Sequence, residues 1–332
     1  MNQTRTVAII NPLPEVLSHF QRALVDNLSF GDGPSRVSAV VLDVPSAEMP
    51  AGSGTGDRMR AGVAFLTQAR KEIVASGADV VVNLWPTFGY MDAALWRGLR
   101  VEPTVWTILH DVQPLRQQFG YWPQMVGPLR LGSPGRHRCV VHTSDAQMEA
   151  ASLGLGTPDV LPHPLLPNDV DSSAGSREVL VFGQYKPARD LDLLERLGPA
   201  LRADGLVPKV VGRGWPEIPG WDIEDRFVAE REVQPLLASA AVVLIPYKKY
   251  YQSGVALRAL ESGTPVVGLR NGFLTEYLGQ DWPGLVVSDS IERWVEAIHG
   301  AVAVEESAVR TVVQEARSKV SAVWQDGLTR AL

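Results

Sequence analysis

The feature that most constrains the fold is a repeated alternation of short apolar runs with longer segments of helical pattern. In the first half, runs rich in valine and isoleucine occur at 7–10, 37–44, 79–85, 104–110, 139–144 and 159–165. A second series occurs at 179–183, 208–212, 241–247, 265–269 and 284–288. Runs that are continuously apolar, rather than alternating, are typical of parallel strands covered by helices on both faces. The pattern therefore predicts an α/β protein.

The two series are separated by residues 166–178, which are rich in Pro, Asn, Asp, Ser and Gly and predict a linker. With 332 residues, 45% of them hydrophobic, the chain can bury two cores. We expect two doubly wound, Rossmann-like parallel-sheet domains, over 1–165 and 179–303, facing each other across a cleft. Residues 304–332 have a helical pattern with no strand after it. We expect this last segment to cross back to the N-terminal domain.

Composition argues against several classes of function. The net charge of −6 argues against nucleic-acid binding, which needs a clustered cationic face. The single cysteine, Cys139, cannot form an intramolecular disulfide, and no Cys/His spacing resembles a zinc site. Neither a signal peptide nor an apolar run of membrane-spanning length is present. We expect a cytoplasmic protein without a bound metal.

One glycine-rich stretch, AGSGTGD at 51–57, resembles a dinucleotide-binding loop only superficially. Such a loop follows the first strand directly and opens a helix. This stretch follows the second strand, whereas the first is followed by NPLPEV. We interpret 45–57 as a mobile loop, and a nicotinamide-dependent dehydrogenase is not favoured.

Two strand-to-helix junctions in the second half are suited to an anion. Gly183 ends a strand, and Lys186 and Arg189 follow where the next helix is expected to begin. Cations at a helix N-terminus oppose its dipole unless an anion lies between them and the helix amides. Ser253 and Gly254 form the other junction, with a helix-capping side chain and a residue that lets a ligand approach the amides. The simpler alternatives are solvated surface cations and an ordinary helix start.

In the first half, a predicted strand delivers His110 and Asp111 to its carboxyl end. A histidine there can share a proton near neutral pH, and an aspartate can orient it or a sugar hydroxyl. The alternative is a structural histidine followed by a helix-capping aspartate. His142 and His163 also follow strands, and we give them less weight.

Residues 116–138 are locally basic and aromatic. No Asp or Glu occurs from Val112 through Ser144, and the segment carries Arg116, Tyr121 and Trp122. Local basicity in an acidic protein favours an anionic acceptor or peripheral contact with a membrane surface. An irregular acceptor-binding loop fits these residues equally well.

With these residues in place, the chain resembles the GT-B glycosyltransferases, specifically the large retaining family numbered four. The resemblance is strongest over 179–278 and rests on GQYKPARDLD at 183–192 and PYKKYYQSGVALRALESGTPVV at 246–267. In the first motif, Gln184 stands where the family has an arginine, and Arg189 takes the place of its lysine. The family's paired glutamates fall on Tyr250 and Arg258, although some branches share the Gln-Ser-Gly-Val form.

The resemblance implies transfer of a hexosyl or deoxyhexosyl group from a nucleotide diphosphate sugar to an acceptor hydroxyl, with retained anomeric configuration and without a metal or other cofactor. The acceptor would be a small molecule, a glycan or a lipid-linked molecule. His110 and Asp111 would be the catalytic pair. The implied ligand-contacting residues are Gly183, Lys186, Arg189, Ser253 and Gly254 for the diphosphate, Gly212, Arg213, Arg258 and Glu261 for the nucleoside, Asn271 and Gly272 for the donor sugar, and Arg116, Tyr121 and Trp122 for the acceptor.

Because both expected glutamates are replaced, other functions stay open. One is a GT-B protein that binds a nucleotide or regulates a partner without transferring sugar. Another is a different GT-B chemistry, such as a sugar-nucleotide epimerase or a transferase that joins cyclitols.

Overall fold

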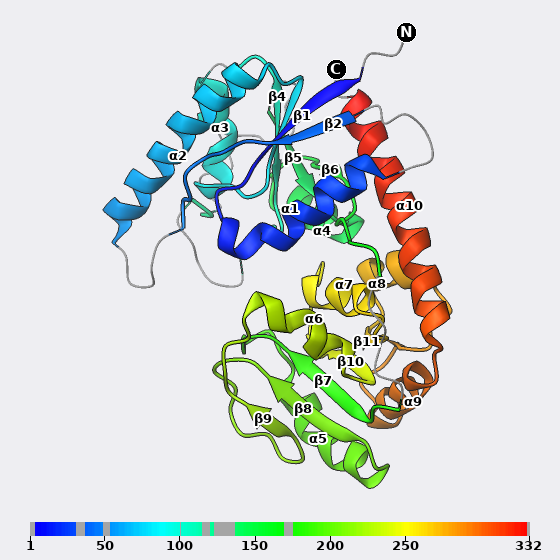
Figure 1. Ribbon diagram of the computed structural model, residues 1–332. Helices are drawn as coiled ribbons and strands as arrows, with labels where there is room; N and C mark the ends of the chain where they lie inside the picture. The colour runs from blue at the N-terminus through cyan, green and yellow to red at the C-terminus, as the bar shows by residue number, and fades with distance from the viewer. Residues whose placement is uncertain are drawn as a thin grey trace. The chain divides into compact units, whose positions relative to one another are not determined.

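The computed structural model describes residues 4–30, 37–48, 54–99, 101–114, 120–122, 137–168 and 175–330. The chain divides into two compact units. Unit 1 comprises Met1–Leu166 and Ser318–Leu332, and unit 2 comprises Pro167–Arg317. Each unit contains a six-stranded sheet with helices packed against it (Figure 1). The expected α/β class with two parallel sheets is confirmed.

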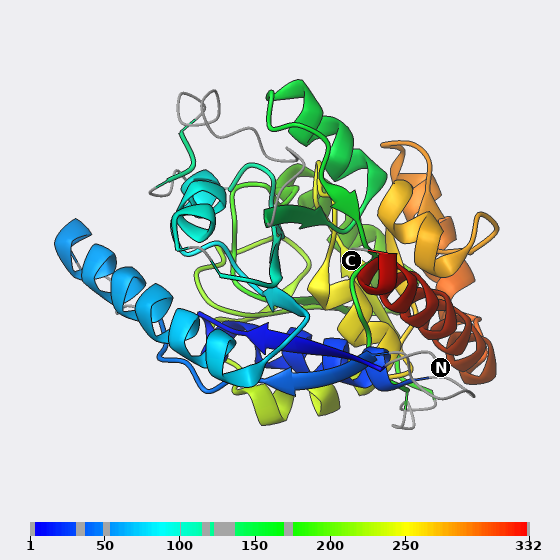
Figure 2. The same ribbon diagram turned by 90° about the horizontal axis from the view of Figure 1, so that it is seen from above.

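In unit 1 the strand order is β2-β1-β3-β4-β5-β6, and every pair is parallel. The strands are β1 (Arg5–Ile10), β2 (Val37–Val41), β3 (Val80–Asn83), β4 (Thr104–Ile108), β5 (His137–Val141) and β6 (Asp159–Val160). The helices are α1 (Pro14–Ser29), α2 (Thr55–Ser76), the short η1 (Gly89–Met91), α3 (Asp92–Gly98) and α4 (Ser144–Ser152). Strands β1 and β2 lie side by side in Figure 1 and Figure 2. The order of the strands reverses between β1 and β3, which makes their carboxyl ends the switch point where ligands bind in such sheets.

The last helix, α10 (Glu306–Arg330), completes the core of unit 1 with its C-terminal half. Trp324 is fully buried, and its indole Nε1 donates to the Pro162 carbonyl at 2.7 Å. Ser321 Oγ donates to the Phe30 carbonyl at 2.8 Å. The C-terminal half of the helix is therefore held in unit 1 through packing and through hydrogen bonds to the backbone.

Unit 2 has the strand order β12-β11-β10-β7-β8-β9, again with parallel pairs. Its strands are β7 (Glu178–Phe182), β8 (Val207–Val211), β9 (Asp222–Glu224), β10 (Val242–Ile245), β11 (Val266–Leu269) and β12 (Leu285–Val286). Its helices are α5 (Leu191–Ala203), α6 (Glu230–Ala238), α7 (Gly254–Glu261), α8 (Gly272–Leu278) and α9 (Ile291–Val302). Here the order reverses between β7 and β10, so the loops after these two strands flank the switch point.

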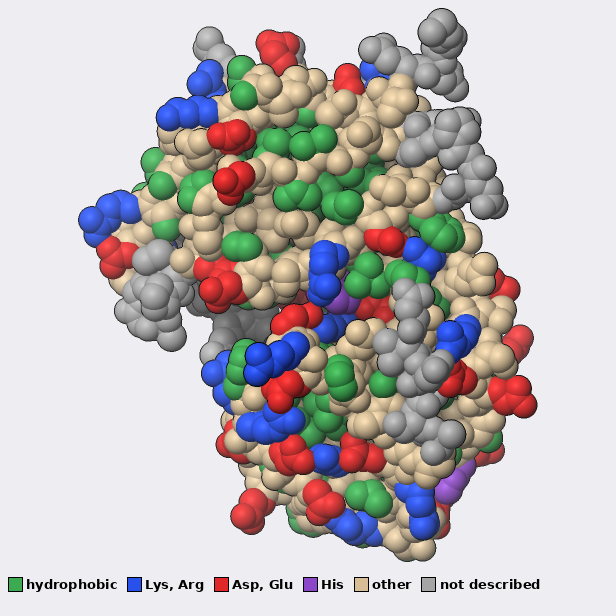
Figure 3. All heavy atoms as spheres, in the orientation of Figure 1, with side chains coloured by type: hydrophobic (Ala, Val, Ile, Leu, Met, Phe, Trp, Pro, Cys, Tyr) green, Lys and Arg blue, Asp and Glu red, His purple; other side chains and the backbone are tan. Residues whose placement is uncertain are grey.

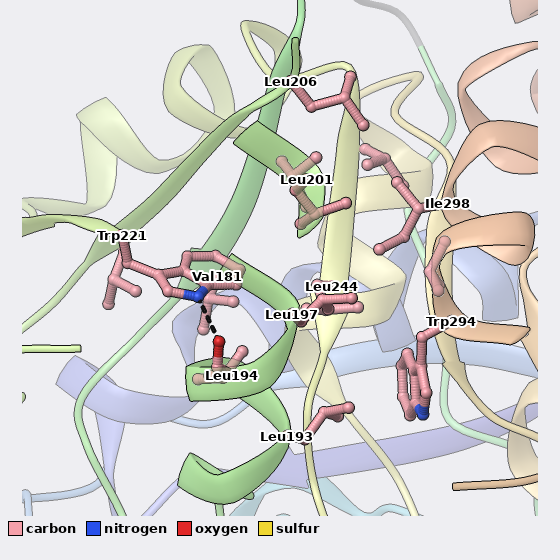
Figure 4. Close-up of a cluster of buried hydrophobic side chains, with 14 of the residues drawn as sticks. Val181, Leu193, Leu194, Leu197, Leu201, Leu206, Trp221, Leu244, Trp294 and Ile298 are labelled. Atoms are coloured by element: carbon pink, nitrogen blue, oxygen red, sulfur yellow. Dashed lines mark hydrogen bonds between the residues drawn. The ribbon is translucent and has the colours of Figure 1, made fainter. Parts of the chain in front are cut away.

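The core of unit 2 packs one face of this sheet against α5 and α9 (Figure 4). Leu194, Leu197 and Leu201 of α5 and Ile298 of α9 are fully buried. Trp221 closes one end of the cluster, and its Nε1 donates to the Leu194 carbonyl at 2.7 Å. This packing fixes the N-terminal end of α5, which follows the loop that carries Arg189.

Each predicted strand is present, although most are shorter than their apolar runs. The strand β9 was not predicted because its three residues, Asp-Ile-Glu, lack an apolar run. The interpretation of 45–57 as a loop is wrong at its end, since α2 begins at Thr55. Thr55, Gly56 and Asp57 form the first turn of that helix, which begins after Gly54 as its N-cap.

Candidate functional site

The loops after β7 and β10 are joined by backbone hydrogen bonds at the switch point of unit 2. The Asp190 amide donates to the Pro246 carbonyl at 2.7 Å, and the Lys248 amide donates to the Ala188 carbonyl at 3.2 Å. Arg189 and Tyr247 form an antiparallel bridge between them. The loop that was expected to carry phosphate-binding cations is therefore held as a rigid part of the sheet edge.

Arg189 is the central charged group of this edge. It is 4% exposed, and its guanidinium carbon lies 4.9 Å from the centre of the Trp215 ring and 4.8 Å from that of Tyr247. One terminal nitrogen donates to the Phe182 carbonyl at 2.7 Å, whereas Nε has no hydrogen-bond partner in the part of the chain that the structure describes. Among the described residues, no carboxylate forms an ion pair with Arg189. Burial lowers its pKa, and two aromatic faces partly offset the cost of a buried cation.

Gly183 and Gly212 bring the loops after β7 and β8 into close contact. Gly183 has φ +104°, and its carbonyl accepts from Trp215 Nε1 at 2.8 Å. A Cβ atom at Gly212 would lie 2.2 Å from the same carbonyl oxygen. Both positions therefore require glycine for this close approach, which in turn places Trp215 against Arg189.

The junction at Ser253 and Gly254 has the expected local form. Ser253 is buried and caps α7 by accepting from the Ala256 amide at 3.2 Å. Gly254 is exposed, and no atom lies within 4 Å of the position a Cβ would take. A ligand can thus approach the first amides of α7 without a side chain in its way. Lys186 is also exposed, on the loop between β7 and α5.

The two positions where the family resemblance expects acids are both engaged inside unit 2. Tyr250 Oη donates to the Leu269 carbonyl at 3.2 Å, and burial raises the pKa of this phenol. Arg258 forms two hydrogen bonds to the Glu230 carboxylate, at 2.8 and 3.0 Å, which join α7 to the start of α6. Glu261 is buried at the C-terminal end of α7. Arg258 and Glu261 therefore differ in environment, one in a partly exposed ion pair and the other inside the unit.

The remaining donor-side residues lie at strand ends or helix starts. Asn271 caps α8 by accepting from the Leu274 amide at 2.8 Å, and its Nδ2 donates to the Tyr250 carbonyl at 3.2 Å. Gly272 follows it and is exposed. Arg213 is exposed after β8, and its guanidinium lies 5.1 Å from the ring of Phe227.

A pocket of about 360 Å³ opens beside α5 and the ends of β10 and β11. Its lining includes Asp190, Asp192 and Asp289, together with Lys248 and Arg196. Arg189, Ser253 and Gly254 are not part of this lining. The residues that the sequence predicts to bind an anion therefore lie outside this pocket.

In unit 1 the structure brings three histidines together, which the sequence analysis did not predict. His110, His142 and His163 follow β4, β5 and β6 and surround Phe20. The ring centres of His110 and His142 lie 5.2 Å apart, and those of His142 and His163 lie 5.1 Å apart. Their common position at the carboxyl ends of adjacent strands explains the cluster.

Burial keeps these histidines neutral, although only His142 and His163 are fully inside the unit and His110 is partly exposed. Burial, reinforced by His142, lowers the pKa of His110 to about 3, and burial lowers the pKa of His142 to about 4. The pKa of His163 is lowered as well, chiefly by burial. His110 Nε2 lies 3.0 Å from the Leu84 carbonyl, so the proton of the neutral ring sits on this nitrogen. His142 Nδ1 lies 2.7 Å from the Leu161 carbonyl, which leaves Nε2 as a buried acceptor that has no hydrogen-bond partner within the described ranges.

The other predicted residues of unit 1 are only partly described. Asp111 follows His110 and is partly exposed. Tyr121 is buried, stacks edge-on against Tyr90 with ring centres 5.0 Å apart, and has a pKa raised by burial. Trp122 is partly exposed, and Arg116 lies outside the described residues, as does most of 116–138.

Four residues that contribute to the edge of unit 2 were missed by the sequence analysis: Trp215, Tyr247, Phe227 and Glu230. Trp215 and Tyr247 enclose Arg189. Trp215 follows the turn after a predicted strand and Tyr247 is the last residue of another, which was a usable signal. Phe227 is 67% exposed, unusual for a large aromatic side chain. Glu230 could not have been found, because its partner Arg258 lies far along the chain.

Solved structures of other proteins show which fold the chain has. The chain matches a sucrose-phosphate synthase from Thermosynechococcus elongatus with a TM-score of 0.61 and 13% identity, over 96% of this chain and 94% of that one. It matches AviGT4, a glycosyltransferase involved in avilamycin A biosynthesis, with a TM-score of 0.61 and 18% identity, over 98% and 97%. HepE from Anabaena, solved in complex with UDP and glucose, matches with a TM-score of 0.58 and 12% identity, over 96% and 95%. The fold is that of the GT-B glycosyltransferases.

One segment of the sequence, within unit 2, also matches a protein family. Residues 176–303 match the family described as "Glycosyl transferases group 1". Unit 2 therefore contains a domain that matches this family, and the resemblance noted in the sequence is confirmed at this level. A search of curated proteins gives no significant match.

Two further findings concern metals and membranes. Within the described ranges, His, Cys, Asp and Glu side chains do not form a group of three that could hold a metal ion. Of the helices that the structure describes, none is long and apolar enough to cross a membrane.

Proposed function

We propose that the protein transfers a sugar from a nucleotide diphosphate donor to an acceptor hydroxyl, with retention of configuration and without a metal ion. The observation that carries this proposal is the environment of Arg189: a buried cation without a carboxylate partner among the described residues, at the switch point of the group 1 domain. Isolated buried charges are unfavourable, and an anionic ligand would complete the site.

In this proposal the diphosphate lies between Arg189 and the N-terminus of α7. Arg189, Lys186 and the amides near Gly254 neutralise the charge that develops on the leaving diphosphate. Gly183 keeps the backbone accessible, and Ser253 holds the start of α7. The negative charge of the leaving group is thus stabilised by protein groups alone.

The remaining roles follow from position. The nucleoside contacts the turn of Gly212 and Arg213 and the ion pair of Arg258 with Glu230, while Glu261 supports α7 from inside. Asn271 and Gly272 contact the donor sugar. In unit 1, His110 and Asp111 orient the reacting hydroxyls, since a neutral imidazole can accept or donate a hydrogen bond without repelling a developing cation.

The test is a binding and product experiment with UDP, GDP and dTDP and their common sugar conjugates. A ligand that binds only the folded protein raises the melting midpoint according to its concentration relative to Kd. We expect one base to stabilise the protein with EDTA present, and NMR of the product to show the anomeric configuration of the donor. Absence of binding by every nucleotide diphosphate would sink the proposal.

A second candidate, a nucleotide-binding protein without transfer, is favoured by one observation. Tyr250 and Arg258, at the positions of the family's paired acids, are engaged with Leu269 and Glu230. Saturable nucleotide binding without sugar transfer or donor hydrolysis, across neutral and charged acceptors, would support this candidate instead. Epimerisation of the donor sugar in the same NMR experiment would indicate the third chemistry.

A further inference from the structure

A cavity of about 380 Å³ lies in unit 1, beside the carboxyl ends of β1 and β3. Most of its lining is apolar or aromatic, including Leu13, Val16, Met59, Trp85 and Phe88. Val16 and Met59 are 69% and 46% exposed, so the apolar wall continues to the mouth of the cavity. The lining comes from α1, α2 and the loops after β2 and β3. The cavity is therefore built at the switch point of the first sheet and is open to a ligand.

The helix terminus at this cavity is already occupied by a side chain of the protein. Glu48 Oε1 accepts from the amides of Glu15 and Val16, at 2.9 and 3.3 Å, in the first turn of α1. Free amides there would attract an anionic ligand, whereas amides bonded to a carboxylate do not. In unit 2, by contrast, the start of α7 at Gly254 is open.

The charges of the described part of the lining cancel. Among the lining residues that the structure describes, Glu48 and Arg58 are the only charged ones, and they contribute one negative and one positive charge. This part of the wall therefore has no net charge that would attract a phosphate or a carboxylate. Its polar groups are instead suited to the hydroxyl groups of an uncharged ligand.

Trp85 gives the cavity a fixed flat wall. Its ring stacks on His110, with centres 5.5 Å apart and planes inclined by 19°. The imidazole of His110 is in turn held by its hydrogen bond to the Leu84 carbonyl. An aromatic wall supported in this way can bind a flat apolar group with little loss of conformational entropy.

From these observations we propose that this cavity binds the acceptor, and that the acceptor is an uncharged molecule in which a flat, apolar group carries sugar-like or phenolic hydroxyls. A sugar phosphate does not fit this chemistry. The role of this molecule as an acceptor rests on the proposed glycosyl transfer. Its binding to unit 1 does not depend on that transfer.

The experiment measures binding without a donor, by quenching of tryptophan fluorescence. The probes are 4-nitrophenyl β-glucoside, which is uncharged and aromatic, and glucose 6-phosphate. We expect saturable quenching by the nitrophenyl glucoside and none by the phosphate. Val16→Glu places a charge at the mouth, and an acid in the first turn of α1 does not disfavour the helix. This variant should weaken binding of the glucoside about tenfold, because the ligand loses its apolar contact with the side chain of Val16.

Val74→Glu is the matched control, because Val74 is 63% exposed on α2 and does not line the cavity. It should bind the glucoside as the wild type does. Glu48→Ala should create binding of glucose 6-phosphate, since it frees the amides of α1 and leaves Arg58. Circular dichroism establishes that each variant is folded.

Three results would overturn the proposal. They are tighter binding of glucose 6-phosphate than of the glucoside by the wild type, equal quenching in wild type and Val16→Glu, and binding of phosphatidylcholine vesicles with no saturable binding of the glucoside. Nucleotide binding is measured separately, so a protein that binds the glucoside but no nucleotide keeps this cavity assignment and loses the proposed function.

Discussion

The two units have the same number of strands and the same kind of switch point. The side chains at the two switch points differ in charge and polarity. The edge of unit 2 offers a buried arginine, an open helix start and bare glycine backbone, all of which suit an anion. The edge of unit 1 offers neutral histidines, aromatic rings and a helix start closed by Glu48. Figure 3 shows a related contrast on one face, where hydrophobic side chains gather on unit 1 and Lys, Arg, Asp and Glu crowd unit 2.

This difference shows that a few side chains at the strand ends can determine which kind of ligand the same sheet architecture binds. The helix termini make the point directly. Both α1 and α7 start beside a switch point, but one is capped by Glu48 from a distant loop and the other by its own Ser253. The first arrangement excludes an anion and the second leaves room for one.

The largest expected effect tests whether each unit can be destabilised without the other. Trp324→Ala should destabilise unit 1 by about 3–5 kcal/mol, because it leaves a cavity and an unpaired Pro162 carbonyl. Hydrogen exchange followed by mass spectrometry should show faster exchange in β5, β6 and α1, with unit 2 unchanged. The matched variant is Trp294→Ala on α9, also buried, which should have the reverse pattern. Equal loosening of both units by either variant would contradict this division.

The next effect tests the anion site. Arg189→Met keeps an apolar side chain between Trp215 and Tyr247 but removes the charge. Affinity for the nucleotide diphosphate should fall about 100-fold, consistent with roughly 1.5–3 kcal/mol for a hydrogen bond to a charged group. Isothermal titration calorimetry measures it. Arg196→Met, an exposed arginine on α5, is the control and should bind as the wild type does. A similar loss of affinity in both variants would contradict the assignment of Arg189 to the anion site.

A smaller effect concerns pH and belongs to unit 1. The pKa of His142 in the folded protein, about 4, lies below its usual value, so the folded state binds fewer protons than the unfolded chain between about pH 4 and 6.5. The stabilisation is complete above pH 6.5 and is lost as the pH falls. Between pH 7 and 5, the free energy of unfolding of His142→Gln should therefore fall by about 1–2 kcal/mol less than that of the wild type. Urea unfolding at each pH measures this difference.

Asp92 sharpens this test because its linkage has the opposite sign. Burial raises the pKa of this carboxyl to about 7, although it accepts hydrogen bonds from the Thr87 and Phe88 amides. Its contribution to stability is greatest when it is protonated and decreases as the pH rises toward 7. Asp92→Asn should lose more stability than the wild type on acidification from pH 7 to 5. Parallel pH profiles for the two variants would show that neither group is linked to folding.

The smallest effect concerns the ion pair that replaces an expected acid. Arg258→Gln and Glu230→Gln should each weaken nucleotide binding about threefold, on the scale of roughly 0.5–1 kcal/mol for a partly exposed ion pair. The double variant should be no weaker than either single one, because the two residues act as one unit. Additive losses in this double-mutant cycle would mean that each side chain contacts the nucleotide separately.

Local sequence determined the strands and the capping of α7. Continuous Val and Ile runs predict buried parallel strands because both faces of such strands are covered, and Ser253 before an apolar helix predicts a cap because its hydroxyl reaches the third amide. These are short-range properties of the chain. The same reasoning placed Gly183 at the end of a strand and Arg189 where the next helix begins, close to where the structure has them.

Tertiary structure alone decided what each of those residues faces. Arg189 is enclosed by Trp215 and Tyr247 because the loops after three strands meet at one edge, and Arg258 pairs with Glu230 because α6 and α7 pack together. The histidine cluster arises for the same reason, since it joins the ends of β4, β5 and β6. Glu48 closes α1 from a loop more than thirty residues away. Sequence spacing carries no information on such contacts, because only the order of the strands in the sheet sets which ends are neighbours.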